Sequence, residues 1–314
     1  MNLYYELLQY PLFSMKEVNA LYTSERTARA ALGKLLKEGM VYKIRKGLYT
    51  CTSGENGGPV ANRFQIASAI TESSYVSHHS AFEYYGIADQ VFYEVYVSSE
   101  TRFHDFEFDG YTYHYVKSQM REGVEALQFS GGISVTDKER TIVDSIRDIN
   151  LIAGLEEVLA CVSSVKDIDE GKLLKYLDKY DSAFLYQKTG FIVEEYRPEM
   201  GISDEFVKIC EGRSGNSKRY LTGGISDPAY SGKWRLVYPR NIKGIKNGVE
   251  NATVYGKSTT EKVKGTRDQY RRVKQDDYLV ADGRHDAIID EDIWNKAREK
   301  RKETGVTWTK IHDL

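Results

Sequence analysis

Two adjacent histidines, His78 and His79, are the residues whose type first suggests chemistry, because imidazole nitrogens bind transition metals. A helix presents two ligands on one face when they are spaced i, i+3 or i, i+4, and these two are direct neighbours. No HExxH-type pattern accompanies them. The surrounding residues 75–86 have the pattern of a short strand, a serine-capped helix and a terminating glycine. We therefore expect packing or capping roles for both rings, and no metal site.

Asp105 and His114 are a second pair with acid–base character. The dipeptide at 109–110 is Asp-Gly, which predicts a β-hairpin with a two-residue turn. Its register places Phe108 opposite Tyr111 and Asp105 opposite His114, so the pair is more simply a cross-strand ion pair. The sequence contains no Walker A motif, no GxSxG, no paired Asp/Glu motif and no Cys/His cluster. We expect a protein that is not an enzyme and needs no cofactor.

The three cysteines, at positions 51, 161 and 210, are far apart and form no CxxC pair. Because three is an odd number, the cysteines cannot form a framework in which every one is paired in a disulfide. The first residues lack the basic and apolar regions of a signal peptide, and no apolar run approaches the ~20 residues of a membrane span. These features predict reduced thiols, a cytoplasmic location and no membrane partner.

Charge divides the 314 residues into three parts. The whole chain has a net charge of −2, with 44 basic and 46 acidic residues. Counted by segment, residues 1–50 carry +4, residues 51–252 carry −8 and residues 253–314 carry +2. Such asymmetry indicates parts with different partners. Gly- and Asn-rich stretches at 53–59 and 247–251 mark the boundaries, because both are typical of loops.

The first 52 residues have the pattern of a winged helix-turn-helix. Apolar residues at helical spacing precede Pro11, and Ser14 with Glu17 predicts a capping box that begins a short second helix. Ser24 is expected to cap a third helix that ends near Gly39. A β-hairpin with a basic tip at 45–47 follows. This order of elements is typical of proteins that read the major groove of DNA.

The expected third helix has one apolar and one basic face. Its basic face has small residues, Ala30 and Gly33, at its centre, so it can approach a duplex closely. The hairpin adds positive charge suited to phosphate contacts. The predicted DNA-binding residues are Ser24, Arg26, Thr27, Arg29, Lys34, Lys37, Lys43, Arg45 and Lys46. The alternative without DNA binding, a solvated charged helix beside an ordinary hairpin, fits the same residues less well.

The middle of the chain predicts an α+β domain. Residues 91–98 alternate as a strand does, and residues 136–139, Thr-Asp-Lys-Glu, form a capping box before an amphipathic helix. Further helical patterns cover residues 155–162 and 173–177, and another begins after Ser203. A late strand is expected at 234–238. We read this part as an interaction domain.

Several segments resemble one known family. Residues 43–49 (KIRKGLY), 75–81 (YVSHHSA), 136–144 (TDKERTIVD) and 218–221 (KRYL) resemble, in order, AbiEi-family antitoxins of type IV toxin–antitoxin systems, which act in abortive phage infection. The resemblance implies an N-terminal domain that represses its own operon. It also implies a domain that neutralises a nucleotidyltransferase-like toxin without a stable complex. The DNA-contacting residues implied by position are Arg26, Arg29, Lys34, Lys43, Arg45 and Lys46.

The last residues resemble a different family. Residues 255–289 contain segments similar to the recombinase domain of large serine recombinases, a domain that contacts DNA in those enzymes. The catalytic resolvase domain and a Cys-rich zinc ribbon are both missing from the sequence. A basic, Tyr-containing stretch at 262–274 and a helix capped by Asp290 are expected here. Weak DNA binding, packing on the middle domain and a passive remnant all remain open as roles.

The resulting domain hypothesis has three parts: a winged helix-turn-helix at 1–52, an antitoxin-like domain at 60–250 and a recombinase-like fragment at 254–314. The preferred function is a DNA-binding autorepressor and antitoxin, whose partners are double-stranded DNA of its own promoter and the toxin. A recombination accessory factor of a mobile element and a plain winged-helix transcription factor are the alternatives.

Overall fold

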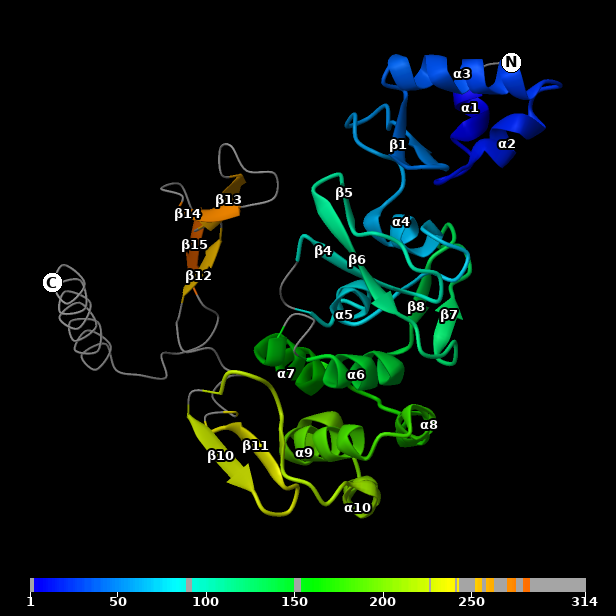
Figure 1. Ribbon diagram of the computed structural model, residues 1–314. Helices are drawn as coiled ribbons and strands as arrows, with labels where there is room; N and C mark the ends of the chain where they lie inside the picture. Colours follow the sequence, from blue (N-terminus) through cyan, green and yellow to red (C-terminus); the bar gives the residue numbers. More distant parts are fainter. Residues whose placement is uncertain are drawn as a thin grey trace, which may run out of the picture. The chain divides into compact units, whose positions relative to one another are not determined.

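The computed structural model describes residues 3–88, 92–149, 154–225, 227–240 and 242, and the backbone of four strands between residues 252 and 282. Its internal contacts divide the chain into two units, Met1–Arg240 and Asn241–Leu314. The first unit combines ten helices and several separate sheets within its described residues, which confirms the α+β class expected from the sequence (Figure 1).

Three helices and a β-hairpin form the N-terminal part of the first unit. They are α1 (Leu3–Leu7), α2 (Met15–Ala20), α3 (Glu25–Lys37), β1 (Val41–Arg45) and β2 (Leu48–Cys51). The predicted capping box begins α2, since the Ser14 backbone N–H donates to Glu17 Oε2 at 2.7 Å. Ser24 occupies the N-cap position of α3, although its hydroxyl accepts no capping hydrogen bond.

A small apolar core holds these elements together. Amphipathic spacing in α3 turns Ala28, Leu32 and Leu35 inward, as predicted, where they meet the other helices and the hairpin. The buried members of this core are Leu3, Leu7, Phe13, Val18, Ala28, Leu32, Leu35, Val41 and Cys51. Because these side chains occupy one face of α3, its other face is left at the surface.

A mixed six-stranded sheet forms the centre of the first unit. Its strands are β3 (Tyr75–Val76), β4 (Glu94–Ser99), β5 (Phe106–Phe108), β6 (Tyr111–Lys117), β7 (Val124–Ala126) and β8 (Ser134–Thr136), in the order β5-β6-β4-β3-β8-β7. The predicted hairpin register is confirmed, with Phe108 opposite Tyr111. The pairs β4–β6 and β3–β8 are parallel, and the helices α4 (Arg63–Ala69) and α5 (His79–Tyr84) pack on the sheet.

Two helix starts in this region differ from the expectation. His78, rather than a serine, occupies the N-cap of α5, with a left-handed φ of 57°. Asp137, rather than Thr136, caps the helix α6 (Lys138–Arg147), because Thr136 is still the last residue of β8. The Asp137 side chain accepts from Arg140 N at 2.8 Å. A capping box read from spacing alone therefore placed this start one residue too early.

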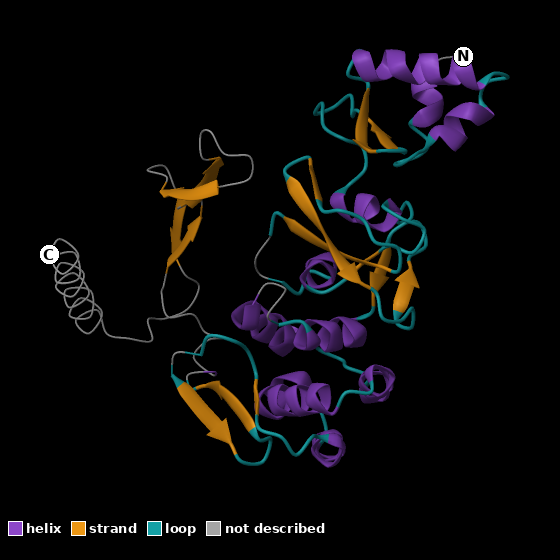
Figure 2. Cartoon of the chain, viewed as in Figure 1, coloured by secondary structure: helices purple, strands orange, loops and turns teal. Residues whose placement is uncertain are grey.

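A helical layer follows the sheet (Figure 2). It consists of α6, α7 (Gly154–Ser164), α8 (Glu170–Tyr180), α9 (Ala183–Met200) and α10 (Asp204–Arg213). In this layer α6 contacts α5, α8 and α9, while α10 packs along α9. The expected cap of α10 is confirmed, since Ser203 Oγ accepts from Phe206 N at 3.2 Å. Helix α9 was not predicted.

A three-stranded sheet completes the first unit. It contains β9 (Arg219–Tyr220), β10 (Pro228–Ser231) and β11 (Leu236–Pro239), in the order β10-β11-β9. Trp234, just before β11, is 1% exposed and packs on Gly190 of α9. The sheet is therefore anchored to the central helix of the unit rather than appended to its surface.

In the second unit the described residues form two antiparallel strand pairs. β12 (Ala252–Tyr255) pairs with β15 (Leu279–Asp282), and β13 (Ser258–Lys262) pairs with β14 (Tyr270–Lys274). The basic stretch expected at 262–274 is described only at its two ends, which lie in β13 and β14, and the helix expected after Asp290 lies outside the described residues. None of the described helices is long and apolar enough to cross a membrane.

Candidate nucleic-acid interface

The outer face of α3 carries four basic side chains around two small residues. Its spacing of i, i+3, i+4, i+7, i+8 and i+11 from Arg26 places all members on one side of the helix. All of them are exposed: Arg26, Arg29, Ala30, Gly33, Lys34 and Lys37. The thirteen residues of α3 give it a length of about 20 Å. The major groove of B-DNA admits an α-helix. Ser24 and Thr27, also exposed, lie at the start of the same helix.

Two ion pairs within α3 and its C-cap partly compensate this charge. Arg29 Nη2 lies 2.6 Å from Glu25 Oε1, and Lys34 Nζ lies 3.8 Å from Glu38 Oε1. All four side chains are largely exposed, so each pair contributes little to stability. Either basic side chain can leave its carboxylate for a phosphate at small cost.

The hairpin residues divide into two groups. Lys43 and Lys46 are exposed, as a phosphate-contacting wing requires. Arg45 is half-buried, and its guanidinium carbon lies 5.4 Å from the ring centre of Phe106 and 5.6 Å from that of Phe103. The structure thus brings Lys43 and Lys46 to the surface but directs Arg45 onto the aromatic residues next to and within β5.

A second contact fixes the hairpin in the same place. The Tyr42 ring meets Phe108 edge-on with centroids 6.2 Å apart, and its hydroxyl donates to Gly57 O at 2.7 Å. The aromatic side of the β5–β6 hairpin therefore serves as a docking surface for β1. The sequence predicts a DNA contact for Arg45 from its charge at the hairpin tip. It does not show that Phe103 and Phe106 lie beside this residue.

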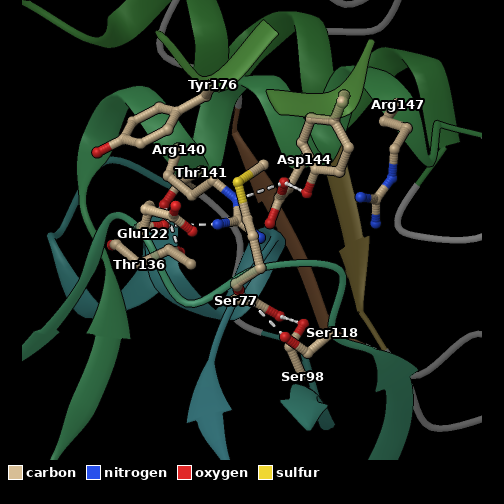
Figure 3. Close-up of polar contacts among 12 residues, drawn as sticks. Ser77, Ser98, Ser118, Glu122, Thr136, Arg140, Thr141, Asp144, Arg147 and Tyr176 are labelled. Carbon is tan, nitrogen blue, oxygen red and sulfur yellow. Dashed lines mark hydrogen bonds and ion pairs between the residues drawn. The ribbon is translucent and has the colours of Figure 1, made fainter. Parts of the chain in front are cut away.

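The segment 136–144 forms part of a buried polar network (Figure 3). Arg140 is 1% exposed, donates from Nε to Asp144 Oδ1 at 2.8 Å, and donates from Nη1 to Glu122 O at 2.6 Å. The Tyr180 hydroxyl also donates to Asp144. Burial lowers the pKa of Arg140, but Asp144 more than reverses this and the net pKa is raised. The guanidinium is therefore permanently charged and fastens α6 to the loop before β7.

His78 joins a neighbouring chain of polar contacts. Its Nδ1 lies 2.8 Å from Ser77 Oγ, which pairs with Ser98 Oγ at 2.8 Å, and its Nε2 lies 3.0 Å from Asp148 Oδ2. Burial raises the pKa of Asp148, but hydrogen bonds from His78 and Arg147 outweigh it and hold the pKa well below 3.8. His78 thus has a packing role, one of the two expected from the sequence; it stands at the N-cap of α5, but its side chain makes no capping hydrogen bond. Contacts from both ring nitrogens hold its strained backbone in place.

His79 lies in a different cluster. Its Nε2 is 3.0 Å from Glu157 Oε1 and its Nδ1 is 2.9 Å from Glu83 Oε1. Burial lowers the pKa of His79, but the two carboxylates more than offset this, so the net pKa is raised. The Cys161 thiol donates to Glu157 at 3.4 Å. Asp105 and His114 form the expected cross-strand pair at 2.8 Å and are both partly exposed.

Comparison with known proteins adds one finding. Residues 214–304 match the family model described as Recombinase. The resemblance of the last residues to recombinases is thereby confirmed, and the match begins within the first unit, before β9. Residues 218–221, for which the sequence suggested a resemblance to AbiEi antitoxins, lie inside it. No curated protein matches the chain.

Proposed function

We propose that residues 3–52 form a winged helix-turn-helix that binds duplex DNA, and that the protein is a DNA-binding regulator of its own operon. The observation that carries the proposal is the exposed basic face of α3 with Ala30 and Gly33 at its centre. Small central residues allow the helix backbone to approach base edges, while Arg26 and Arg29 reach guanines or phosphates. Lys43 and Lys46 add phosphate contacts from the hairpin.

Binding of the full chain to its own promoter tests this proposal. Replacing Arg26 and Arg29 together with alanine should weaken binding at least tenfold and make it less dependent on salt, since fewer counterions are released. The matched control replaces Lys175 and Lys208, two exposed lysines on α8 and α10, with the same loss of charge. Fluorescence anisotropy across a salt series is the measurement. Equal affinities for the two double variants would overturn the proposal.

The more specific form of this function is that of an antitoxin. It rests on the resemblance of residues 75–81 and 136–144 to AbiEi antitoxins. These segments are adjacent, since β3 and β8 pair in parallel at Val76 and Val135, and α5 contacts α6. Their adjacency is consistent with a shared role in one domain. On this proposal residues 60–250 neutralise a nucleotidyltransferase-like toxin and residues 1–50 do not. Growth rescue during co-expression with the toxin tests it.

The Recombinase match favours a second candidate, an accessory DNA-binding protein of a mobile element. Both candidates use the surface of α3 and differ in the partner of the remaining residues. The adjacent gene distinguishes them: a nucleotidyltransferase-like toxin supports the antitoxin, and a resolvase-type integrase supports the accessory factor. If neither gene is adjacent, a plain winged-helix transcription factor is the remaining form of the proposal.

A further inference from the structure

Two helices of the first unit face each other with ligand-type side chains. On α5, His79 and Glu83 are spaced i, i+4, and on α7, Glu157 and Cys161 have the same spacing. Each pair therefore lies on one face of its helix. The two faces meet, because His79 Nε2 lies 3.0 Å from Glu157 Oε1 and Cys161 Sγ lies 3.4 Å from the same oxygen.

These three atoms form a compact buried triangle. The imidazole nitrogen, the carboxylate oxygen and the sulfur all lie within 4.8 Å of one another, and His79, Glu157 and Cys161 are all buried. A tetrahedral zinc ion with ordinary bond lengths separates such ligand atoms by roughly 3.3–3.6 Å. Two of the observed separations, 3.0 and 3.4 Å, are close to these values, and the third, between His79 Nε2 and Cys161 Sγ, lies within 4.8 Å.

The far side of the imidazole faces a carboxylate that is itself fixed in place. Glu83 Oε1 lies 2.9 Å from His79 Nδ1, and the same carboxylate is fixed by Arg63 and by the Phe92 N–H at 3.1 Å. This contact places negative charge beside Nδ1 without the geometry of a hydrogen bond, and Nε2 faces the partner ligands on the other side of the ring. The Phe92 ring packs edge-on against the imidazole with centroids 4.2 Å apart, which restricts its rotation.

We propose that His79, Glu157 and Cys161 bind a divalent transition metal, with zinc as the ion best suited to this donor set. One nitrogen, one oxygen and one sulfur ligand come from the chain, and a water completes the tetrahedron. Binding displaces the thiol proton of Cys161 and the proton shared between His79 and Glu157, and both protons are released to solvent. The ion ties α5 to α7, so its role is to hold these two helices together.

Metal binding by the full chain tests the proposal directly. The protein is stripped with a chelator and titrated with cobalt, which reports a thiolate ligand through a near-ultraviolet charge-transfer band. We expect saturation at one ion per chain, displacement of the cobalt by zinc, and a thermal midpoint raised by zinc. Because this titration uses the unaltered sequence, it does not depend on whether a variant folds. Absence of the band overturns the proposal and leaves the cluster as a hydrogen-bonded network.

Single substitutions assign the ligands. Cys161→Ser should abolish the charge-transfer band, and His79→Gln should weaken cobalt binding at least tenfold. The matched control is Cys210→Ser, which alters another buried cysteine of the first unit. That control should keep the band and one ion per chain. A band that is lost in the Cys210 variant and kept in the Cys161 variant would contradict the assignment.

Discussion

The indole of Trp234 occupies the space in which a side chain at Gly190 would have to lie. A Cβ placed on Gly190 would overlap the Trp234 ring and approach Cys210 Cβ to 2.9 Å. The Trp234 Nε1–H also donates to Glu194 Oε2 at 2.5 Å, one turn further along α9. Since Trp234 belongs to the part of the chain that matches the Recombinase family, the start of that match is built into the core of the first unit.

Gly190→Ala is expected to destabilise the protein by about 1–3 kcal/mol, because the tightly packed ring must move. Urea unfolding of the full chain measures the change. Gly212→Ala is the control, since this helical glycine has nothing within 4 Å of a Cβ, and the substitution should be neutral or stabilising. Equal effects at the two positions would contradict the packing argument.

Arg45→Ala should destabilise the protein by about 0.5–2 kcal/mol, since it removes the guanidinium from Phe103 and Phe106. Lys46→Ala, one residue further along, should change the free energy of unfolding by less than about 0.5 kcal/mol, because Lys46 is exposed. Urea unfolding compares the two. A neutral Arg45→Ala with weakened DNA binding would instead support the DNA-binding role predicted for Arg45 from the sequence.

Gly33→Glu should weaken DNA binding more than tenfold without loss of stability. A Cβ at Gly33 meets nothing within 4 Å, and glutamate favours helix more than glycine does, so the fold tolerates the change. The acidic side chain would face phosphate at the centre of the α3 surface. Anisotropy and thermal unfolding are measured together, with Gly33→Ala as the control that retains both properties. Unchanged DNA affinity in the glutamate variant would argue against this docking face.

Acid is expected to destabilise the protein partly through Asp148. Its pKa in the folded protein is held below 3.8 by His78 and Arg147 despite burial, so its contribution is present above about pH 4 and is lost as the pH falls further. Asp148→Asn should cost about 1.5–3 kcal/mol at pH 7 and flatten the loss of stability below pH 4. Urea unfolding from pH 3 to 7 measures both effects. Asp227→Asn, in an exposed pair with Arg240, should produce neither.

Residues 254–314 are expected to be dispensable for promoter binding and for toxin neutralisation. A chain that ends after Asn251 keeps the whole first unit, whereas one that ends after Arg213 lacks Trp234 and should lose its cooperative unfolding. Promoter binding, growth rescue and urea unfolding compare the two. If the chain that ends after Asn251 folds but loses either activity by more than about tenfold, roughly 1.4 kcal/mol, residues 254–314 contribute to that activity.

The sequence predicted those elements that are amphipathic or capped locally. Helix α3 has an apolar face and a basic face, and the Ser14–Glu17 box marks the start of α2, so both were found. Helix α9 was missed because residues 185–193 are all buried, and a helix buried on every side shows no 3.6-residue period. The short α4 was also missed, although Asn62 and Gln65 form a capping box at its start.

The clusters around the two histidines were predicted only in part. The two neighbouring rings contact different carboxylates, His78 that of Asp148 and His79 that of Glu157. The i, i+4 spacings of His79 with Glu83 and of Glu157 with Cys161 were visible in the sequence. Nothing local, however, indicates that α5 and α7 face each other, because that contact joins residues far apart in the chain.

The place of Trp234 has a consequence during synthesis of the protein. The ribosome makes α9 first, and at ordinary elongation rates Trp234 follows Gly190 by about 2–9 s. Between the emergence of Gly190 and the emergence of Trp234 from the ribosome, we expect the face of α9 that the indole will cover to be exposed on the nascent chain. We therefore expect the nascent first unit to be a chaperone client until residues 214–240 emerge.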